Sequence, residues 1–217
     1  MRFNGVLFDL DGTLLDTVSD IGFYINRTLS RHGYSPFPQE RVHTILGWGL
    51  KVALSKVLPE DKASDDAYLS ELTAELIEDY NSNPVIDTVP YPGIPELLAE
   101  LKRRGIKLGV FSNKADPVTR RVLDITFGKG FFDAVLGSDA GFPRKPEPAG
   151  ALDVVRRMGL PAEDVLYVGD TPMDHKTAVN AGIFDITVTW GFRTREHLME
   201  KGVTRFVETP DEILQYF

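Results

Sequence analysis

Apolar residues follow two different periods along the chain. Between residues 18 and 82 they recur every three or four positions, as at Ile21, Ile25 and Leu29, which is the spacing of one helix face. Short continuous apolar runs, typical of buried strands, occur at Val6 to Phe8 and again after residue 105. The pattern therefore predicts a helical segment set into a chain of alternating strands and helices.

The predicted strands after the first one cover residues 106–112, 134–137, 165–169, 186–190 and, with a weaker pattern, 205–207. The predicted helices cover residues 18–32, 40–45, 50–57, 67–82, 94–104, 116–127, 148–158, 174–181, 194–201 and a last one from 211. Strands that alternate with helices in this way form a parallel sheet covered on both faces. The pattern thus predicts an α/β fold with a doubly wound parallel sheet.

The segment between the first two predicted strands is unusually long. A crossover between parallel strands needs only about a dozen residues, whereas residues 16–87 are almost entirely helical in pattern. We therefore expect an α/β core domain made of residues 1–15 and 88–217. Residues 16–87 would form an inserted helical domain.

Composition excludes several classes of function. The chain has 217 residues, a net charge of −8 and no cysteine. An acidic chain is a poor partner for nucleic acid, and the lack of cysteine excludes thiol nucleophiles, disulfides and zinc–thiolate sites. No apolar stretch approaches the roughly 20 residues of a membrane span, and no signal peptide is indicated. We therefore expect a cytoplasmic protein that binds neither membranes nor nucleic acid.

The first predicted strand runs directly into Asp9-Leu10-Asp11-Gly12-Thr13. Positions i and i+2 of a strand point the same way, so Asp9 and Asp11 would crowd their charges together. Unpaired ionised groups are costly at a partly dry strand end, and Mg²⁺ held by oxygen ligands is a common remedy. Gly12 permits a sharp turn, and Thr13 offers a hydroxyl and an N–H to an anion. The motif indicates attack by a carboxylate on a phosphoryl group.

Further polar motifs fall at predicted strand ends or in adjoining loops and helix starts. They are Ser112-Asn113-Lys114, Lys145-Pro146 and the run from Gly169 to Asp174, which contains Asp170. Ligands of an open parallel sheet bind beyond the carboxyl ends of its strands, so these motifs are expected to gather there. Taken alone, Ser112 and Asn113 are also typical of a helix cap.

In this order the motifs resemble the four signature motifs of the haloacid dehalogenase (HAD) superfamily. Two features resemble the bacterial phosphoglycolate phosphatase group. They are the predicted helical insert and the residues of three short motifs, Ser112-Asn113-Lys114, Asn180-Ala181-Gly182 and Trp190-Gly191-Phe192. The resemblance covers essentially the whole chain. It implies a Rossmann-like HAD fold with a helical cap and an Mg²⁺-dependent phosphatase activity.

The resemblance also implies catalytic and metal-binding roles. Asp9 is the expected nucleophile, which forms an aspartyl-phosphate, and Asp11 is the expected proton donor and acceptor. Asp9 and Asp170 are expected to hold Mg²⁺ together with the backbone carbonyl of Asp11. Lys145 is expected to balance the charge of the transferring phosphoryl group and to contact it.

The remaining motif residues are expected to support the site. Thr13, Ser112 and Asn113 would bind the substrate phosphate. Asp174 would hold either a metal-bound water or Lys145, although an acid in the first turn of a helix is also favoured by the helix dipole alone. Arg144, next to Lys145, leaves open which of the two cations faces inward.

Three other residues are weaker candidates. Gly47-Trp48-Gly49 fails the pattern of a dinucleotide-binding loop, but in the family this segment lies over the active site. Trp48 and Lys51 are therefore candidate specificity residues. The ordinary alternatives are that Trp48 is a packed aromatic residue and that Lys51 is an exposed lysine in the first turn of a helix. His175 either lies near the site or is a solvated residue at a helix start.

The expected activity is hydrolysis of a small phosphorylated metabolite, with phosphoglycolate as the leading substrate. The dehalogenases of the superfamily lack the equivalent of Asp11, which favours phosphoryl transfer here. A phosphomutase of the β-phosphoglucomutase type and a pyrophosphatase stay open as alternatives. An inactivated binding or regulatory protein is disfavoured because the whole motif set is present. The sequence favours neither a monomer nor a homodimer.

Overall fold

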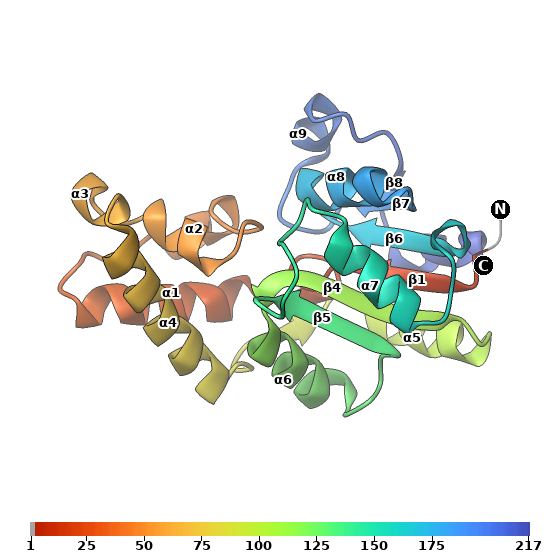
Figure 1. The fold of residues 1–217 in the computed structure, drawn as a ribbon, viewed down its shortest axis with the longest axis horizontal. Helices are drawn as coiled ribbons and strands as arrows, with labels where there is room; N and C mark the ends of the chain where they lie inside the picture. The colour runs from red at the N-terminus through yellow and green to blue at the C-terminus, as the bar shows by residue number, and fades with distance from the viewer. Residues whose placement is uncertain (1–2) are drawn as a thin grey trace.

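The computed structural model describes residues 3–217 and contains a parallel sheet with helices on both faces (Figure 1). Residues 1 and 2 of the predicted core segment lie outside the described residues. The six strands are arranged in the order β5-β4-β1-β6-β7-β8, and every neighbouring pair is parallel. The predicted α/β class is therefore confirmed. The strands are β1 (Gly5–Phe8), β4 (Lys107–Ala115), β5 (Ala134–Ser138), β6 (Val165–Gly169), β7 (Phe184–Val188) and β8 (Phe206–Val207).

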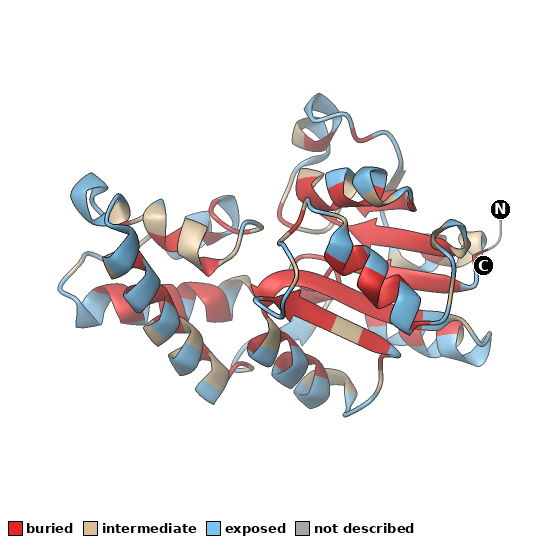
Figure 2. Ribbon diagram, in the orientation of Figure 1, coloured by how far each residue is buried: buried red, intermediate tan, exposed pale blue. Residues whose placement is uncertain are grey.

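The central strand β1 shows why the sheet needs helices on both faces. All four of its residues are buried, and successive side chains point to opposite faces. Leu7 packs into one apolar cluster, together with residues of the helices α7 and α8, while Val6 and Phe8 pack into the other, with residues of α5 and α6. Figure 2 shows the result as a buried sheet between helices whose outer faces are exposed. The helices of this region are α5 (Ile94–Arg103), α6 (Asp116–Phe127), α7 (Ala149–Arg157), α8 (Pro172–Ala181) and α9 (Arg195–Glu200), with short 3₁₀ helices at Ala162–Asp164 and Pro210–Tyr216.

The chain leaves the sheet after β1 and forms a separate group of helices at one side (Figure 1). We call this group, from α1 to α4, the helical insert. Two short strands, β2 (Leu15–Asp16) and β3 (Val89–Pro90), pair antiparallel where the chain enters and leaves it. Its elements are α1 (Val18–Arg31), a 3₁₀ helix (Gln39–Thr44), α2 (Leu50–Ser55), α3 (Glu60–Ala63) and α4 (Asp66–Ser82).

Several predicted elements differ in detail from those observed. The segments at 40–45 and from 211 are 3₁₀ helices rather than α-helices, and the strand predicted at 186–190 lies at 184–188. The strand predicted at 106–112 continues to Ala115 through an irregularity in its pairing after Phe111. The short elements β2, β3, α3 and the 3₁₀ helix Ala162–Asp164 were not predicted, because two to four residues are too few to show a period. None of the helices within residues 3–217 is long and apolar enough to cross a membrane.

Asp20, in the first turn of α1, ties the two ends of the helical insert together. Its side chain is buried and its carboxylate accepts hydrogen bonds from the backbone N–H groups of Ile86, Asp87 and Thr88 at 2.9, 2.8 and 3.0 Å. The Thr88 hydroxyl donates a fourth bond of 2.6 Å. One carboxylate therefore accepts four hydrogen bonds from residues 86–88 and holds the exit of the insert against its entrance.

We predict that Asp20→Asn destabilises the protein by about 2–4 kcal/mol, because the amide turns an N–H group toward donors that need an acceptor. Urea denaturation followed by circular dichroism measures this loss. Asp61→Asn makes the same chemical change at an exposed position of the insert and should leave the midpoint unchanged. Equal midpoints for the two variants would show that the Asp20 bonds contribute nothing net.

Candidate active site

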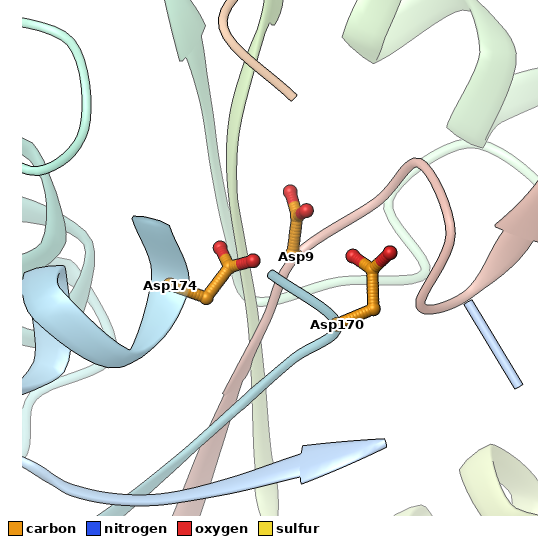
Figure 3. Close-up of side chains that lie close together, drawn as sticks. All are labelled: Asp9, Asp170 and Asp174. Atoms are coloured by element: carbon orange, nitrogen blue, oxygen red, sulfur yellow. The ribbon is translucent and has the colours of Figure 1, made fainter. Parts of the chain in front are cut away.

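Three carboxylates converge at the carboxyl ends of β1 and β6 (Figure 3). Asp9 follows the last residue of β1, Asp170 follows the last residue of β6, and Asp174 lies in the first turn of α8. One oxygen of each lies within 4.8 Å of the others, and the three residues are only 8%, 0% and 2% exposed. Parallel strands place their carboxyl ends at one edge, which is why residues so distant in sequence meet here.

A single ammonium group lies between two of these carboxylates. The Nζ atom of Lys145 is 2.8 Å from Oδ1 of Asp9 and 2.7 Å from Oδ1 of Asp174. Its side chain is buried, whereas Arg144 is partly exposed and pairs with Asp139 on the outside. Lys145 is therefore the inward-facing cation of the two.

Asp174 is fully occupied as a hydrogen-bond acceptor. Its Oδ1 accepts from Lys145 and from the Tyr167 hydroxyl, and its Oδ2 accepts from the backbone N–H and the hydroxyl of Thr171. The last two bonds form part of a capping box that begins α8. A carboxylate has about four acceptor positions, so Asp174 has little capacity left for a metal and instead positions Lys145.

Asp170 keeps acceptor capacity. Its Oδ2 accepts a 2.8 Å bond from the backbone N–H of Phe192, and its Oδ1 accepts a longer one of 3.3 Å from the Thr13 hydroxyl. With Asp9, it therefore offers free oxygen lone pairs at the centre of the cluster. The oxygen-only donor set and its negative charge fit a hard divalent cation.

The electrostatics of the three carboxylates and Lys145 support the same conclusion. Burial, followed by the nearby charge of Asp174, raises the pKa of Asp9 from 3.8 to about 7, even though Lys145 lowers it. Burial and the charges of Asp174 and Asp9 also raise the pKa of Asp170 well above its ordinary value. Burial lowers the pKa of Lys145, but the two carboxylates outweigh it and hold the lysine charged. A bound cation would remove the remaining imbalance.

Asp11 lies apart from the three-carboxylate cluster. β1 ends at Phe8, so the strand geometry expected for Asp9 and Asp11 does not extend to them, and the Asp11 side chain turns toward Lys114 instead. The Lys114 Nζ donates to both Asp11 oxygens, at 2.8 and 3.1 Å, and lies 4.6 Å from the centre of the Tyr80 ring of α4. Burial alone would lower the pKa of Lys114, but the charge of Asp11 outweighs burial and the net pKa is raised, so this lysine stays charged.

The predicted phosphate-binding residues occupy different positions. Ser112 and Asn113 line the cavity beside Asp9 and Asp11, as expected. Thr13 is fully buried, and its hydroxyl faces Asp170, so in this structure it positions that carboxylate. Their roles toward substrate stay predictions.

Asn113 also connects the core to the helical insert. Its Oδ1 accepts from the backbone N–H of Lys145 at 2.9 Å, and its Nδ2 donates to the carbonyl of Gly47 at 3.2 Å. One side chain therefore contacts both the residue that carries the buried ammonium group and the glycine segment of the insert. Sequence reasoning missed this second contact because it depends on how the insert lies on the core.

The loop of residues 190–193 is a second connection that the sequence did not reveal. The Trp190 indole donates to the carbonyl of Thr13 at 3.1 Å, and Gly191 lies so close to Asp170 and Gly12 that a side chain there would collide with both. Arg193 then reaches the insert and donates to the carbonyls of His43 and Leu46 at 2.8 and 2.7 Å.

The cavity between these groups is small and closed over by the insert. Its volume is about 40 Å³, and Leu46, Gly47, Gly49 and Leu50 of the insert form part of its lining. Ligand pockets typically measure roughly 300–1,000 Å³. The structure therefore corresponds to a closed arrangement of insert and core.

The weaker candidates lie elsewhere. Trp48 is 50% exposed and lines a neighbouring cavity, and Lys51 pairs with Asp66 on the outside of the insert. The His175 ring lies 2.7 Å from Asp185. None of these three side chains lines the cavity beside Asp9.

The family model for haloacid dehalogenase-like hydrolases matches residues 6–188. The phosphoglycolate phosphatase of Aquifex aeolicus is 36% identical over 187 residues, which cover 86% of this chain and 85% of the relative. The phosphoglycolate phosphatase of Cereibacter sphaeroides strain ATCC 17029 is 34% identical over 190 residues, which cover 87% of this chain and 86% of the relative. A crystal structure of a predicted phosphoglycolate phosphatase from Lactobacillus delbrueckii subsp. bulgaricus superimposes on this chain with a TM-score of 0.88. The two sequences are 28% identical, and the match covers 98% of this chain and 97% of that protein.

The parallel sheet and the aspartate–lysine cluster at its carboxyl edge define a hydrolase, and the chain belongs to the haloacid dehalogenase-like hydrolase family. Within it, the chain falls in the phosphoglycolate phosphatase-like group and is a phosphoric monoester hydrolase. The resemblance inferred from the motifs is thereby confirmed.

The raised pKa of Asp9 leads to a testable pH dependence. The folded state retains the Asp9 proton up to about pH 7, whereas the unfolded chain loses it near 3.8, so this contribution to stability is lost as the pH rises between these values. We predict that, in EDTA, Asp9→Asn is more stable than the wild type at pH 8, by up to about 4 kcal/mol. The difference should disappear near pH 4.

Chemical denaturation across this pH range measures the effect. Asp61→Asn, at an exposed position, should follow the wild type at every pH. A constant difference between Asp9→Asn and the wild type would contradict the raised pKa.

Proposed function

We propose that the protein hydrolyses small phosphate monoesters, with Mg²⁺ as its cofactor and through an aspartyl-phosphate on Asp9. The observation that carries this proposal is the contact of Lys145 with Asp9, beside Asp170 and at the edge of a closed cavity. A carboxylate nucleophile needs neighbours that offset its charge and that of the incoming phosphoryl group, and these residues supply them.

The side chains of Asp9 and Asp170, together with the backbone carbonyl of Asp11, would hold the Mg²⁺ ion. When bound, the cation neutralises charge on the phosphoryl oxygens and on the nucleophile. Asp170 is held in place for this purpose by the N–H of Phe192 and the hydroxyl of Thr13. Asp174 acts indirectly, by fixing Lys145.

In the first step a carboxylate oxygen of Asp9 attacks phosphorus, and the bond from phosphorus to the ester oxygen breaks. Asp11 donates a proton to that oxygen, which leaves as an alcohol. In the second step Asp11 takes a proton from a water molecule that attacks the aspartyl-phosphate, which releases inorganic phosphate and restores Asp9. Lys114 fixes the orientation of the Asp11 carboxylate for both transfers.

The phosphate oxygens would be bound by Lys145 and by the hydroxyl and backbone N–H groups at Ser112 and Asn113. The helical insert, as the predicted cap domain of residues 16–87, excludes bulk water when it lies over the site. Since the cavity is small in this arrangement, the insert must move away for substrate to enter.

Phosphoglycolate is the substrate that we propose first. The relatives from Aquifex aeolicus and Cereibacter sphaeroides are phosphoglycolate phosphatases, and the match covers more than four fifths of each. A small substrate also suits a small closed cavity.

We predict that the wild type releases phosphate from phosphoglycolate only when Mg²⁺ is present, and that Asp9→Asn lowers kcat by more than about a thousandfold. The amide keeps the shape of Asp9 but cannot attack phosphorus. Phosphate release with and without EDTA measures both effects. Asp61→Asn is the matched control, and full activity of Asp9→Asn would overturn the mechanism.

Asp11→Asn tests the proton transfer separately. We expect kcat to fall by about a hundredfold to ten-thousandfold, because the leaving oxygen departs without a proton. Folding and Mg²⁺ binding should persist, since the expected metal contact of Asp11 is its backbone carbonyl. An unchanged kcat, measured by phosphate release at saturating substrate, would remove Asp11 from this role.

A further inference from the structure

A second and larger cavity adjoins the catalytic one. Its volume is about 520 Å³, within the range of small-molecule sites. It lies between the helical insert, which contributes Trp48 and Lys56, and the core, which contributes residues of α8, α9 and the 190–193 loop. Neither the proposed mechanism nor the expected substrate uses it.

The lining of this cavity is strongly basic. Lys56, Lys176, Arg193, His197 and Lys201 all line it, and no carboxylate does; we call these five residues the basic cluster. The whole chain has a net charge of −8, so such a local excess of positive charge is not a general property of its surface.

The lysines and the arginine of this cluster have no carboxylate partner within residues 3–217, although Arg193 donates hydrogen bonds to the backbone carbonyls of His43 and Leu46. Lys56 comes from the insert and Arg193 from the core, and burial together with the charge of Arg193 lowers the pKa of Lys56. Like charges that face each other across a boundary repel, and an anion between them would relieve the repulsion.

This cavity is separate from the catalytic one. Gly47 and Thr171 line both, so the two cavities adjoin at these residues, whereas Asp9, Asp11 and Lys145 line only the catalytic one. A side chain at Gly47 would place its Cβ 3.6 Å from the Thr171 methyl group and 3.8 Å from a nitrogen of Arg193. A molecule in the larger cavity would therefore touch insert and core at once without contacting Asp9.

The lining also indicates what kind of anion fits. Trp48, which is 50% exposed, Met173 and two prolines add apolar surface next to the cations. Apolar walls with a few convergent charged groups are typical of sites for small organic molecules. We propose that the basic cluster forms a second anion-binding site, for a small organic molecule that carries two or more negative charges.

Calorimetric titration with methylenediphosphonate tests this proposal. This probe has several negative charges and a P–C–P link that is not a phosphate ester. Magnesium is left out, so that no turnover occurs and the catalytic pocket retains its excess of carboxylates. Binding is therefore measured independently of the proposed phosphatase activity.

We expect Lys56→Gln/Lys201→Gln to bind the probe about tenfold more weakly than the wild type, because it loses one cation from the insert and one from the core. The control Lys62→Gln/Lys129→Gln removes the same two charges from exposed positions, again one in the insert and one in the core, and should bind like the wild type. Both lysine pairs are on the surface, so each variant should fold, which circular dichroism verifies. Equal affinity of both double variants, or no binding by the wild type at millimolar probe, would overturn the proposal.

Discussion

Burying Asp9, Asp170 and Asp174 within 4.8 Å of one another is costly, because each negative charge makes the next harder to hold away from water. The surrounding structure is arranged to meet this cost. Lys145 bridges two of the carboxylates, the Thr171 capping box satisfies Asp174, and the N–H of Phe192 stabilises Asp170. What is left is a charge imbalance that a divalent cation would satisfy. The site is thus incomplete in charge without its metal, which is the property a metal-dependent hydrolase needs.

Residues next to those that satisfy the charges also contact the helical insert. Asn113 touches the backbone of Lys145 and the carbonyl of Gly47, and the loop that supplies the Phe192 N–H continues into Arg193, which holds His43 and Leu46. Closure of the insert and the arrangement of the charged centre therefore share residues. A movement of the insert must break bonds to the same short segments that orient Lys145 and Asp170.

The motif residues could be predicted from sequence because they follow strands whose apolar runs are plain, and parallel strands bring their carboxyl ends together. This reasoning located Asp9 and Asp170, whereas Lys145, in the loop after β5, was expected from the order of the motifs; the structure places the three side chains together. It also predicted the parallel sheet. The boundary of the inserted domain at residues 16–87 and the role of each site residue toward substrate stay predictions.

The contacts that were not predicted depend on tertiary position. Asp20 lies in an ordinary helix pattern, Arg193 in a loop and Lys114 at the end of a strand, and each contacts a partner at least 66 positions away in the sequence. The local pattern of apolar and polar residues cannot predict such a long-range contact. The prediction that Asp9 and Asp11 point the same way was wrong for a related reason. The strand ends before Asp9, and the turn that follows directs the Asp11 side chain to Lys114.

The central place of β1 in the sheet also bears on how the chain acquires its structure during synthesis. β1 is made first, yet its neighbours β4 and β6 follow it by about 100 and 160 residues. At a synthesis rate of roughly 5–20 residues per second, this apolar strand waits for seconds before either partner leaves the ribosome. The helices of the insert, whose contacts are mostly local, can form in that interval. Asp9 is therefore translated well before Lys145 and Asp170, and the charged cluster is complete only after both of these residues have been made.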